Sequence, residues 1–473
     1  MLWIMSNRMR LLVCLFLGAA VLAKAGDDAS LRRETFDSDP GWESYRSRLV
    51  PNPLPVTKQD FGYRENGEIG GWVQRSVTPA YYAKVIPTKT LNDKLSASGK
   101  VAVRSNSAPS GVLFGWFNES SRGWRTPNSL TFRLDGNGNS YWVFFEYGTR
   151  NWLTGGGATF EGRYQTTKTK PIPADGSMHD WSLSYDPNGD GGDGLITLTF
   201  DGTNYTRALL AGHRVDGAEF NRFGLFNQQA TGGGMEVFLS ALQIDGQRED
   251  LSRDPKWDGR GNKVEFADRT IRPMHDFGHS LTSRAGGQKG EIGGVIWRDE
   301  APAFYGAKVG PLTLRDELFA SGKLAFAGAA SDSGVYFGWF DSQSKSNKNI
   351  SDHKEPQKNL LGIAIEGPSR VGYYFVPGYR DALGEGQLAS SGPIIRPDGK
   401  VHEWSIHYIP GIAGARGKII SKLDGAEQML ELTAEQEKVN ATFDRFGIFN
   451  MQVGGHFVEI YLDELTYTAN PRR

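Results

Sequence analysis

Short runs in which apolar and polar residues alternate recur along the chain, and turns rich in glycine separate them. Residues 130–135 and 141–147 flank a Gly-Asn-Gly-Asn turn, and residues 181–185 and 195–200 flank a turn rich in Gly and Asp. Alternation with a period of two is typical of half-buried strands, and two such runs around a tight turn predict a β-hairpin. The continuous apolar run 111–117 predicts a fully buried strand.

Helical periodicity is rare by comparison. Only residues 429–439 show a pattern that fits a short helix, and no stretch fits a long amphipathic one. The composition agrees, because 60 of the 473 residues are glycine and 12% are aromatic, which suits tight turns and strands. We therefore predict an all-β fold, either a sandwich or a barrel.

Many motifs of the first half of the chain occur again in the second half. Residues 39–42 return as 254–257, residues 67–71 as 290–294, residues 114–117 as 337–340, and residues 222–227 as 445–450. Each copy spans about 210 residues, which is the size of a whole domain and far above the period of a stacked repeat. We predict two tandem domains, 34–246 and 254–469, joined by the short polar linker 247–253.

Two hairpins in the chain share an order of motifs with a known group of folds. Residues 402–408 contain a strand with Trp404, and after a turn residues 419–425 end in Asp-Gly; residues 179–185 and 195–202 repeat this order. The pattern resembles the laminin-G-like and concanavalin A-like jelly rolls. The resemblance implies two antiparallel β-sandwich (jelly-roll) domains, each with a concave sheet that is often the ligand face. Lectins, glycoside hydrolases, polysaccharide lyases and adhesion domains share this fold, so it implies no single activity.

The first 25 residues have the pattern of a secretory signal peptide. Arg8 and Arg10 precede the apolar run 11–23, and Ala-Lys-Ala ends at residue 25. The run is shorter than the ~20 residues that span a bilayer. We therefore expect an extracellular or periplasmic protein without membrane insertion. The single cysteine, Cys14, lies in this leader, so the mature chain would form no disulfide and no thiolate metal site.

Positive and negative charges are balanced. The chain has 53 Lys and Arg and 54 Asp and Glu, and loss of the leader would leave 50 basic and 54 acidic residues. This balance lacks the basic footprint of proteins that bind nucleic acid. We expect no nucleic-acid partner.

Two glutamates are the first candidates for catalysis. Glu68 and its counterpart Glu291 lie in the repeated Gly-Glu-Ile-Gly-Gly segment. Such a carboxylate can act as a general acid or base, or can accept hydrogen bonds from sugar hydroxyls. The alternative is a structural glutamate satisfied by an arginine or by backbone N–H groups.

A third candidate, Glu459, belongs to a pattern similar to that of concanavalin A-like glycosidases, which carry Glu-x-Asp-x-x-Glu on one strand. Glycoside hydrolysis needs a pair of carboxylates. Tyr461 stands at the position of the central acid, and only Glu236 remains in the first copy. The segments around Phe226 and Phe449 are similar to a lyase strand, but phenylalanine replaces the tyrosine that acts in those lyases. Neither enzyme pattern is complete.

One turn is a weak candidate for a metal site. Asp186, Asn188 and Asp190 follow the spacing at the start of an EF-hand calcium loop, but Thr197 stands where the loop needs a glutamate. A hairpin turn is the better interpretation. We expect no cofactor, with Ca²⁺ at this turn as the alternative.

Aromatic residues near variable loops are the better candidates for a ligand site. Sugar rings stack their C–H faces on flat side chains, and planar polar groups bind the hydroxyls. The candidates for carbohydrate binding are Trp124, Trp142, Tyr147, Arg150, Trp152, Tyr379 and Arg380. We predict a protein that binds carbohydrate or polysaccharide. A glycoside hydrolase or polysaccharide lyase and a structural or adhesive surface protein are the alternatives, and the oligomeric state stays open.

Overall fold

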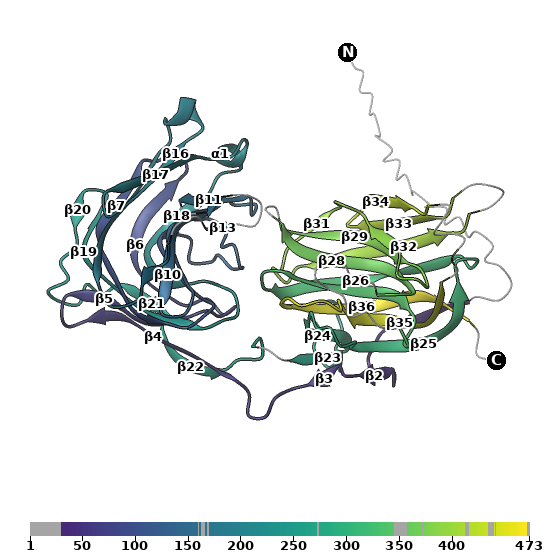
Figure 1. The fold of residues 1–473 in the computed structure, drawn as a ribbon. Helices are drawn as coiled ribbons and strands as arrows, with labels where there is room; N and C mark the ends of the chain where they lie inside the picture. Colours follow the sequence, from purple (N-terminus) through teal and green to yellow (C-terminus); the bar gives the residue numbers. More distant parts are fainter. Residues whose placement is uncertain are drawn as a thin grey trace, which may run out of the picture.

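The fold consists almost entirely of antiparallel strands. The computed structural model describes residues 30–158, 160–161, 166–167, 170–271, 274–344, 357–369, 372–411, 416–433, 439 and 441–470; the expected leader lies outside them. Among these residues the only helical elements are the 3-10 turn η1 (Asp190–Gly192) and α1 (His213–Asp216). The strands form two β-sandwiches, which confirms the predicted fold class (Figure 1).

The first sandwich has a nine-stranded and an eight-stranded sheet. The nine-stranded sheet has the order β17 (Thr203–Ala208), β16 (Leu195–Phe200), β15 (Met178–Asp186), β7 (Leu95–Asn106), β19 (Gly234–Ile244), β5 (Glu68–Gln74), β4 (Val56–Arg64) and β22 (Lys263–Ala267), with β20 (Gln247–Arg248) on β19. The eight-stranded sheet has the order β11 (Thr154–Ala158), β10 (Ser140–Gly148), β9 (Ser129–Gly136), β8 (Ser110–Phe117), β18 (Glu219–Asn227), β6 (Tyr81–Thr90) and β21 (Asp258–Arg260), with β14 (Ile172–Pro173) on β10. A separate hairpin joins β12 (Phe160–Glu161) to β13 (Thr166–Thr167).

The second sandwich has the same arrangement. Its nine-stranded sheet has the order β3 (Arg48–Leu49), β23 (His275–Ser280), β24 (Glu291–Trp297), β36 (Phe457–Ala469), β26 (Leu318–Ala329), β32 (Val401–Ile409), β33 (Lys418–Leu423) and β34 (Ala426–Glu431), with β1 (Ser30–Glu34) on β36. Its eight-stranded sheet has the order β2 (Glu43–Tyr45), β25 (Phe304–Thr313), β35 (Thr442–Asn450), β27 (Ser333–Phe340), β28 (Leu360–Ser369), β29 (Gly372–Arg380) and β30 (Gly386–Leu388), with β31 (Ile394–Ile395) on β29.

Both cores lie between the paired sheets and consist of the residues that the alternation placed inward. The apolar run 111–117 forms β8, in which every residue is buried. The paired tryptophans Trp116 and Trp339 are fully buried. The expected helix over 429–439 is wrong at its start, because Ala426–Glu431 forms strand β34 and pairs with β33. The exposure of β34 alternates as in a strand. The prediction was wrong because the few apolar residues of this segment fit a helical spacing as well.

The two sandwiches exchange their terminal strands. The N-terminal strands β1, β2 and β3 pair with β36, β25 and β23 of the second sandwich. In return β20, β21 and β22 pair with β19, β6 and β4 of the first sandwich. Figure 1 shows the two connections, between β3 and β4 and between β22 and β23, passing between the sandwiches on the same side of the molecule. The ranges 34–246 and 254–469 therefore follow the sequence repeat, whereas strand pairing groups residues 30–49 with the second sandwich and residues 254–267 with the first.

The repeated Asp-Pro-x-Trp motif anchors each exchanged segment. The Asp39 carboxylate accepts hydrogen bonds from the Gly41 N–H at 2.9 Å and the Tyr305 hydroxyl at 3.0 Å. The first bond closes a turn in which residue 41 has a φ of 66°, a conformation that glycine adopts without strain. The turn directs Trp42 onto Tyr305, with 5.7 Å between the ring centroids. A residue of the first repeat thus completes the second core.

The second copy of the motif repeats this geometry on the first sandwich. Asp254 accepts hydrogen bonds from the Lys256 N–H at 2.9 Å and the Tyr82 hydroxyl at 3.3 Å. Trp257 stacks on Tyr82 with 5.8 Å between the centroids. Burial and the neighbouring Asp254 carboxylate raise the pKa of Tyr82 to about 12. The exchange is therefore reciprocal.

Substitution of Trp42 tests the exchange. Trp42→Ala removes a side chain that is 9% exposed, and should lower the free energy of unfolding by about 3–5 kcal/mol in urea titrations. Amide hydrogen exchange should accelerate in β25, to which the exchanged segment is paired, and stay slow in β6. Trp257→Ala is the matched variant and should give the opposite pattern. Faster exchange in β6 after Trp42→Ala would contradict the exchanged arrangement.

Candidate functional site

A large groove opens beside the exchanged N-terminal segment. It has a volume of about 1270 Å³ and lies between that segment and strand β25 of the second sandwich. Its charged lining residues are Arg32, Glu34, Glu43, Lys308, Asp316 and Arg445. The remaining wall includes Trp42 and the backbone of Val309, Gly310 and Pro311. The groove therefore depends on residues from both repeats.

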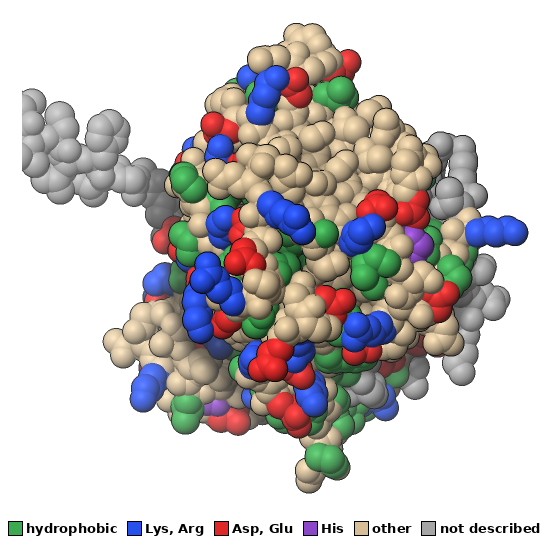
Figure 2. All heavy atoms as spheres, turned by 90° about the vertical axis from the view of Figure 1, so that its left-hand side faces the viewer, with side chains coloured by type: hydrophobic (Ala, Val, Ile, Leu, Met, Phe, Trp, Pro, Cys, Tyr) green, Lys and Arg blue, Asp and Glu red, His purple; other side chains and the backbone are tan. Residues whose placement is uncertain are grey.

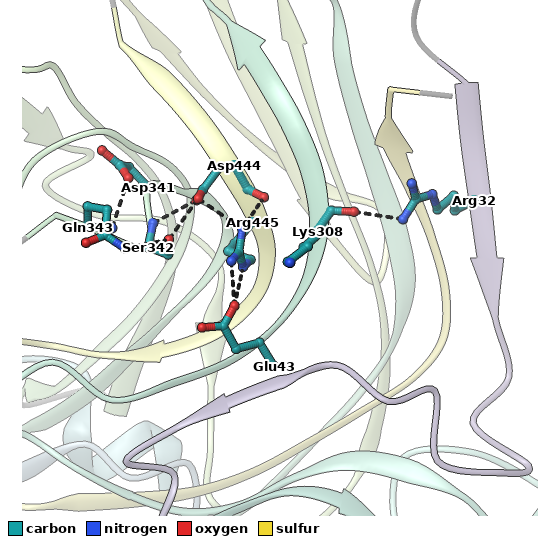
Figure 3. Close-up of polar contacts among 8 residues, drawn as sticks. All are labelled: Arg32, Glu43, Lys308, Asp341, Ser342, Gln343, Asp444 and Arg445. Carbon is teal, nitrogen blue, oxygen red and sulfur yellow. Dashed lines mark hydrogen bonds and ion pairs between the residues drawn. The ribbon is translucent and has the colours of Figure 1, made fainter. Parts of the chain in front are cut away.

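Arg445 ties the exchanged segment to the sandwich (Figure 3). Its guanidinium Nε donates to the Glu43 Oε2 at 3.0 Å, and its Nη1 donates to the Asp444 Oδ2 at 2.9 Å. Asp444 is held in turn by the Ser342 N–H and hydroxyl, each at 2.7 Å. Arg445 is 9% exposed, whereas the Glu43 and Asp444 side chains are 40% and 38% exposed, so only the guanidinium is shielded from water. The Glu43 and Asp444 carboxylates neutralise the positive charge of Arg445 inside the wall of the groove.

The first sandwich has the same arginine network at the corresponding position. Arg222 binds the carboxylates of Asp258, at 3.0 Å, and Glu119. Asp258 follows Trp257 as Glu43 follows Trp42, so both exchanged segments offer a carboxylate to the arginine of the other repeat. The network occurs twice and is best explained as part of the framework.

Two further cations distinguish the groove of the second sandwich. Arg32 donates from Nη1 to the Lys308 carbonyl at 2.8 Å and from Nη2 to the Asn470 carbonyl at 3.3 Å. The Lys308 side chain is exposed. In the part of the chain that the structure describes, neither cation forms an ion pair with a carboxylate. Both charges therefore stay available to the groove.

Lys308 lies beside the arginine network. In the register of β25 and β35 it is directly opposite Arg445. Side chains in such pairs approach within about 4.5–5.5 Å at Cβ. The corresponding pair in the first sandwich is Arg222 opposite Val85. The backbone therefore does not require a cation at position 308.

Arg32 has a neutral counterpart as well. Arg32 pairs with Tyr467 of β36. At the corresponding place in the first sandwich, the neutral Gln247 pairs with Ile244 of β19. The Arg32 and Lys308 pair is thus specific to the second sandwich. Both residues lie outside the repeated motifs, although an alignment of the two copies that extended through residue 85 would have shown valine in one copy and lysine in the other.

The predicted carbohydrate-binding residues are dispersed. Tyr147 and Tyr379 are fully buried in the two cores. Arg150 is paired with Glu219 at 3.6 Å, and the Arg380 Nη1 donates to the Gly384 carbonyl.

Three tryptophans complete that set of candidates. Trp142 is half-buried on β10. Trp124 and Trp152 lie together against Tyr373 of the second sandwich, around a cavity of about 10 Å³. That space holds about one water molecule. A sugar site at these tryptophans stays a prediction.

The candidate catalytic glutamates are each engaged by donors of this chain. Glu68 accepts from the Asn66 Nδ2 at 2.7 Å and is paired with Arg104 at 3.3 Å. Glu291 is fully buried and accepts from the backbone N–H groups of Arg284, at 2.9 Å, and Ala285, at 2.7 Å.

Glu459 and Asp463 lie on strand β36 near Glu291. Glu459 accepts the Tyr461 hydroxyl at 2.8 Å and is paired with Arg284 at 3.7 Å. Asp463 is 2% exposed, and burial, followed by the nearby Glu464 and Glu291, raises its pKa to about 6. Burial thus brings the pKa of Asp463 close to neutral pH.

The predicted calcium turn is occupied by side chains of the protein itself. The Asp186 Oδ1 accepts the Asn188 N–H at 3.0 Å, and its Oδ2 is paired with Lys94 at 3.2 Å. Arg214 donates to the carbonyls of Pro187 and Gly192. Within the described residues, no three His, Cys, Asp or Glu side chains gather as they would around a metal ion. In the same residues, no helix is long and apolar enough to cross a membrane.

The surface of the first sandwich carries mixed charge. Figure 2 shows Lys and Arg interspersed with Asp and Glu on that side of the molecule. Examples of such pairs on its nine-stranded sheet are Lys100 with Asp180 at 2.8 Å and Arg104 with Glu68. Opposite charges here are neighbours, in contrast to the two cations of the groove.

Comparisons with known proteins find similarity to solved structures at low sequence identity. No protein-family model and no curated protein sequence matches the chain. The LG4-5 domains of the mouse laminin α1 chain match 88% of this chain and 93% of theirs, at 10% identity and a TM-score of 0.24. Peanut lectin matches over 41% of this chain and 90% of its own, at 12% identity and a TM-score of 0.26. Lectin I-B4 of Griffonia simplicifolia matches over 41% of this chain and 92% of its own, at 13% identity and a TM-score of 0.26.

The raised pKa of Asp463 predicts a pH-dependent stability. An aspartate ionises near pH 3.9 in an unfolded chain, so between about pH 4 and 6 the folded state binds the proton more tightly. The free energy of unfolding should therefore fall as the pH rises through this window. Asp463→Asn removes the titration and should be more stable than the wild type above pH 6, with the difference vanishing near pH 4. Urea titrations at several pH values measure the free energy of unfolding of the wild type and the variant. Parallel pH profiles of the two proteins would refute the assignment of this pH dependence to Asp463.

Proposed function

We propose that this is a secreted carbohydrate-binding protein that holds its ligand in the groove beside the exchanged N-terminal segment. The observation that carries the proposal is the groove itself, an open space of about 1270 Å³ with a largely polar wall. Small-molecule pockets measure about 300–1,000 Å³. The larger space fits several units of an oligosaccharide better than a single small metabolite.

The groove wall suits a sugar chain chemically. Carboxylate, guanidinium and amide groups, for example Glu34, Arg32 and Asn470, can exchange hydrogen bonds with hydroxyls. Pro40 and Pro311 supply apolar surface for the C–H faces of sugar rings. The combination of apolar surface with a few placed polar groups is that of sites for polar organic ligands.

Binding is the better proposal than hydrolysis or elimination. Glycoside hydrolysis needs one carboxyl group that donates a proton and a second that attacks or activates water across the scissile bond. Glu68, Glu291 and Glu459 are instead bound to donors of their own loops and strands, and none of them lines the groove.

A bulky residue in the groove wall tests this proposal. Pro40→Trp should weaken binding at least tenfold in titrations with soluble dextran, polygalacturonate and chondroitin sulfate, because the indole would occupy the space of the ligand. Pro255→Trp is the matched control, since Pro255 holds the same place in the motif on the first sandwich. Its affinity should equal that of the wild type. Failure of the wild type to bind any of the three polysaccharides at millimolar sugar concentration would sink the proposal.

A further inference from the structure

A pair of like charges is concentrated in the groove of the second sandwich at two positions whose counterparts in the first sandwich are neutral. Arg32 and Lys308 come from different repeats and meet through the hydrogen bond from the Arg32 Nη1 to the Lys308 carbonyl, at 2.8 Å. The corresponding positions of the first sandwich, Gln247 and Val85, are neutral. The framework is thus complete without either cation.

The carboxylates of the groove are each engaged by other groups of the wall. Glu43 binds Arg445, and Glu34 accepts the Tyr467 hydroxyl at 3.2 Å. The Asp316 Oδ2 accepts the Thr313 N–H at 2.7 Å and its hydroxyl at 3.0 Å. Although the lining holds three acids and three bases, each acid is engaged with the wall.

The two cations are prepared for an anion. The guanidinium of Arg32 is fixed by two carbonyls, and a guanidinium carries five N–H donors, so further donors remain for a ligand. Lys308 adds an exposed ammonium nearby. A fixed guanidinium beside an ammonium is the donor set that favours carboxylate or sulfate groups.

The strand register points in the same direction. Lys308 lies opposite Arg445, whose charge is already balanced by Glu43 and Asp444, and the corresponding place in the first sandwich holds valine. The lysine therefore adds a positive charge that the arginine network does not need. With a formal net charge of −1, the chain as a whole does not attract polyanions, so an anionic ligand would be drawn by the local pair.

We infer that the ligand of the groove is an anionic polysaccharide, whose carboxylate or sulfate groups bind Arg32 and Lys308. This inference rests on the proposed carbohydrate-binding function and names the class of its ligand. It also assigns anion binding to the second sandwich alone.

Three polymers with one backbone test the inference. Dextran, carboxymethyl-dextran and dextran sulfate differ in charge and share the same glucan chain. The full-length protein should bind at least one charged polymer at least tenfold more tightly than dextran, as measured by calorimetry at 0.15 M salt. The two charged polymers distinguish carboxylate from sulfate recognition. The double variant Arg32→Gln with Lys308→Val, which installs the residues of the first sandwich, should lose that preference.

Matched variants separate a specific site from general attraction. Lys100→Val removes one exposed lysine of the first sandwich and should keep the preference, as should Lys308→Arg. Lys308→Val should melt close to the wild type, because valine occupies the corresponding place opposite Arg222 in the first sandwich. Equal affinity for dextran and the charged polymers, or an unchanged preference in the double variant, would overturn the inference and leave carbohydrate binding intact. If none of the three polymers nor those of the Pro40 experiment binds, the proposed function fails as well.

Discussion

Stacking of a tryptophan of one repeat on a tyrosine of the other is the contact on which the arrangement depends. Each contact places an aromatic ring of an exchanged segment against the core of the opposite sandwich: Trp42 stacks on Tyr305, and Trp257 stacks on Tyr82. The aspartate that precedes each tryptophan binds the hydroxyl of the same tyrosine. Since strands β1–β3 and β20–β22 lie beside these anchors, the edges of both sandwiches are completed by the opposite half of the chain.

Local pattern was enough to predict the strands. The alternating run 181–185 lies in β15, which pairs with β16 around the predicted turn, and the apolar run 111–117 lies in β8. The exchange could not be predicted in this way. Identical Asp-Pro-x-Trp motifs fit either tyrosine locally, and only the path of the chain decides which one they reach. Segment 426–431 shows the same limit, because its strand is defined by pairing with β33.

The candidate site was harder to predict than the fold. Tyr147 and Tyr379 follow variable loops in the sequence, yet their rings fill the two cores, because a strand alternates faces and loop proximity does not reveal which face is buried. Arg32 and Lys308 carry no motif and are 276 residues apart in the chain. Their proximity results from the exchange, since β1 and β25 meet only after the N-terminal segment crosses to the second sandwich. The repeated Arg445 was recognised, but its role in the framework required knowledge of Glu43 as its partner.

Exchange and site are therefore physically linked. Without the N-terminal segment the second sandwich would lose Arg32 and Glu43, and Arg445 would keep a buried charge with Asp444 as its remaining carboxylate. Leaving the shielded guanidinium with fewer acceptors costs free energy, so docking of this segment is favoured for reasons of the fold alone. The same docking delivers Arg32 to Lys308. Duplication supplied two equivalent frameworks, and a difference at two positions, Arg32 and Lys308 against Gln247 and Val85, is sufficient to place two further cations in one of them.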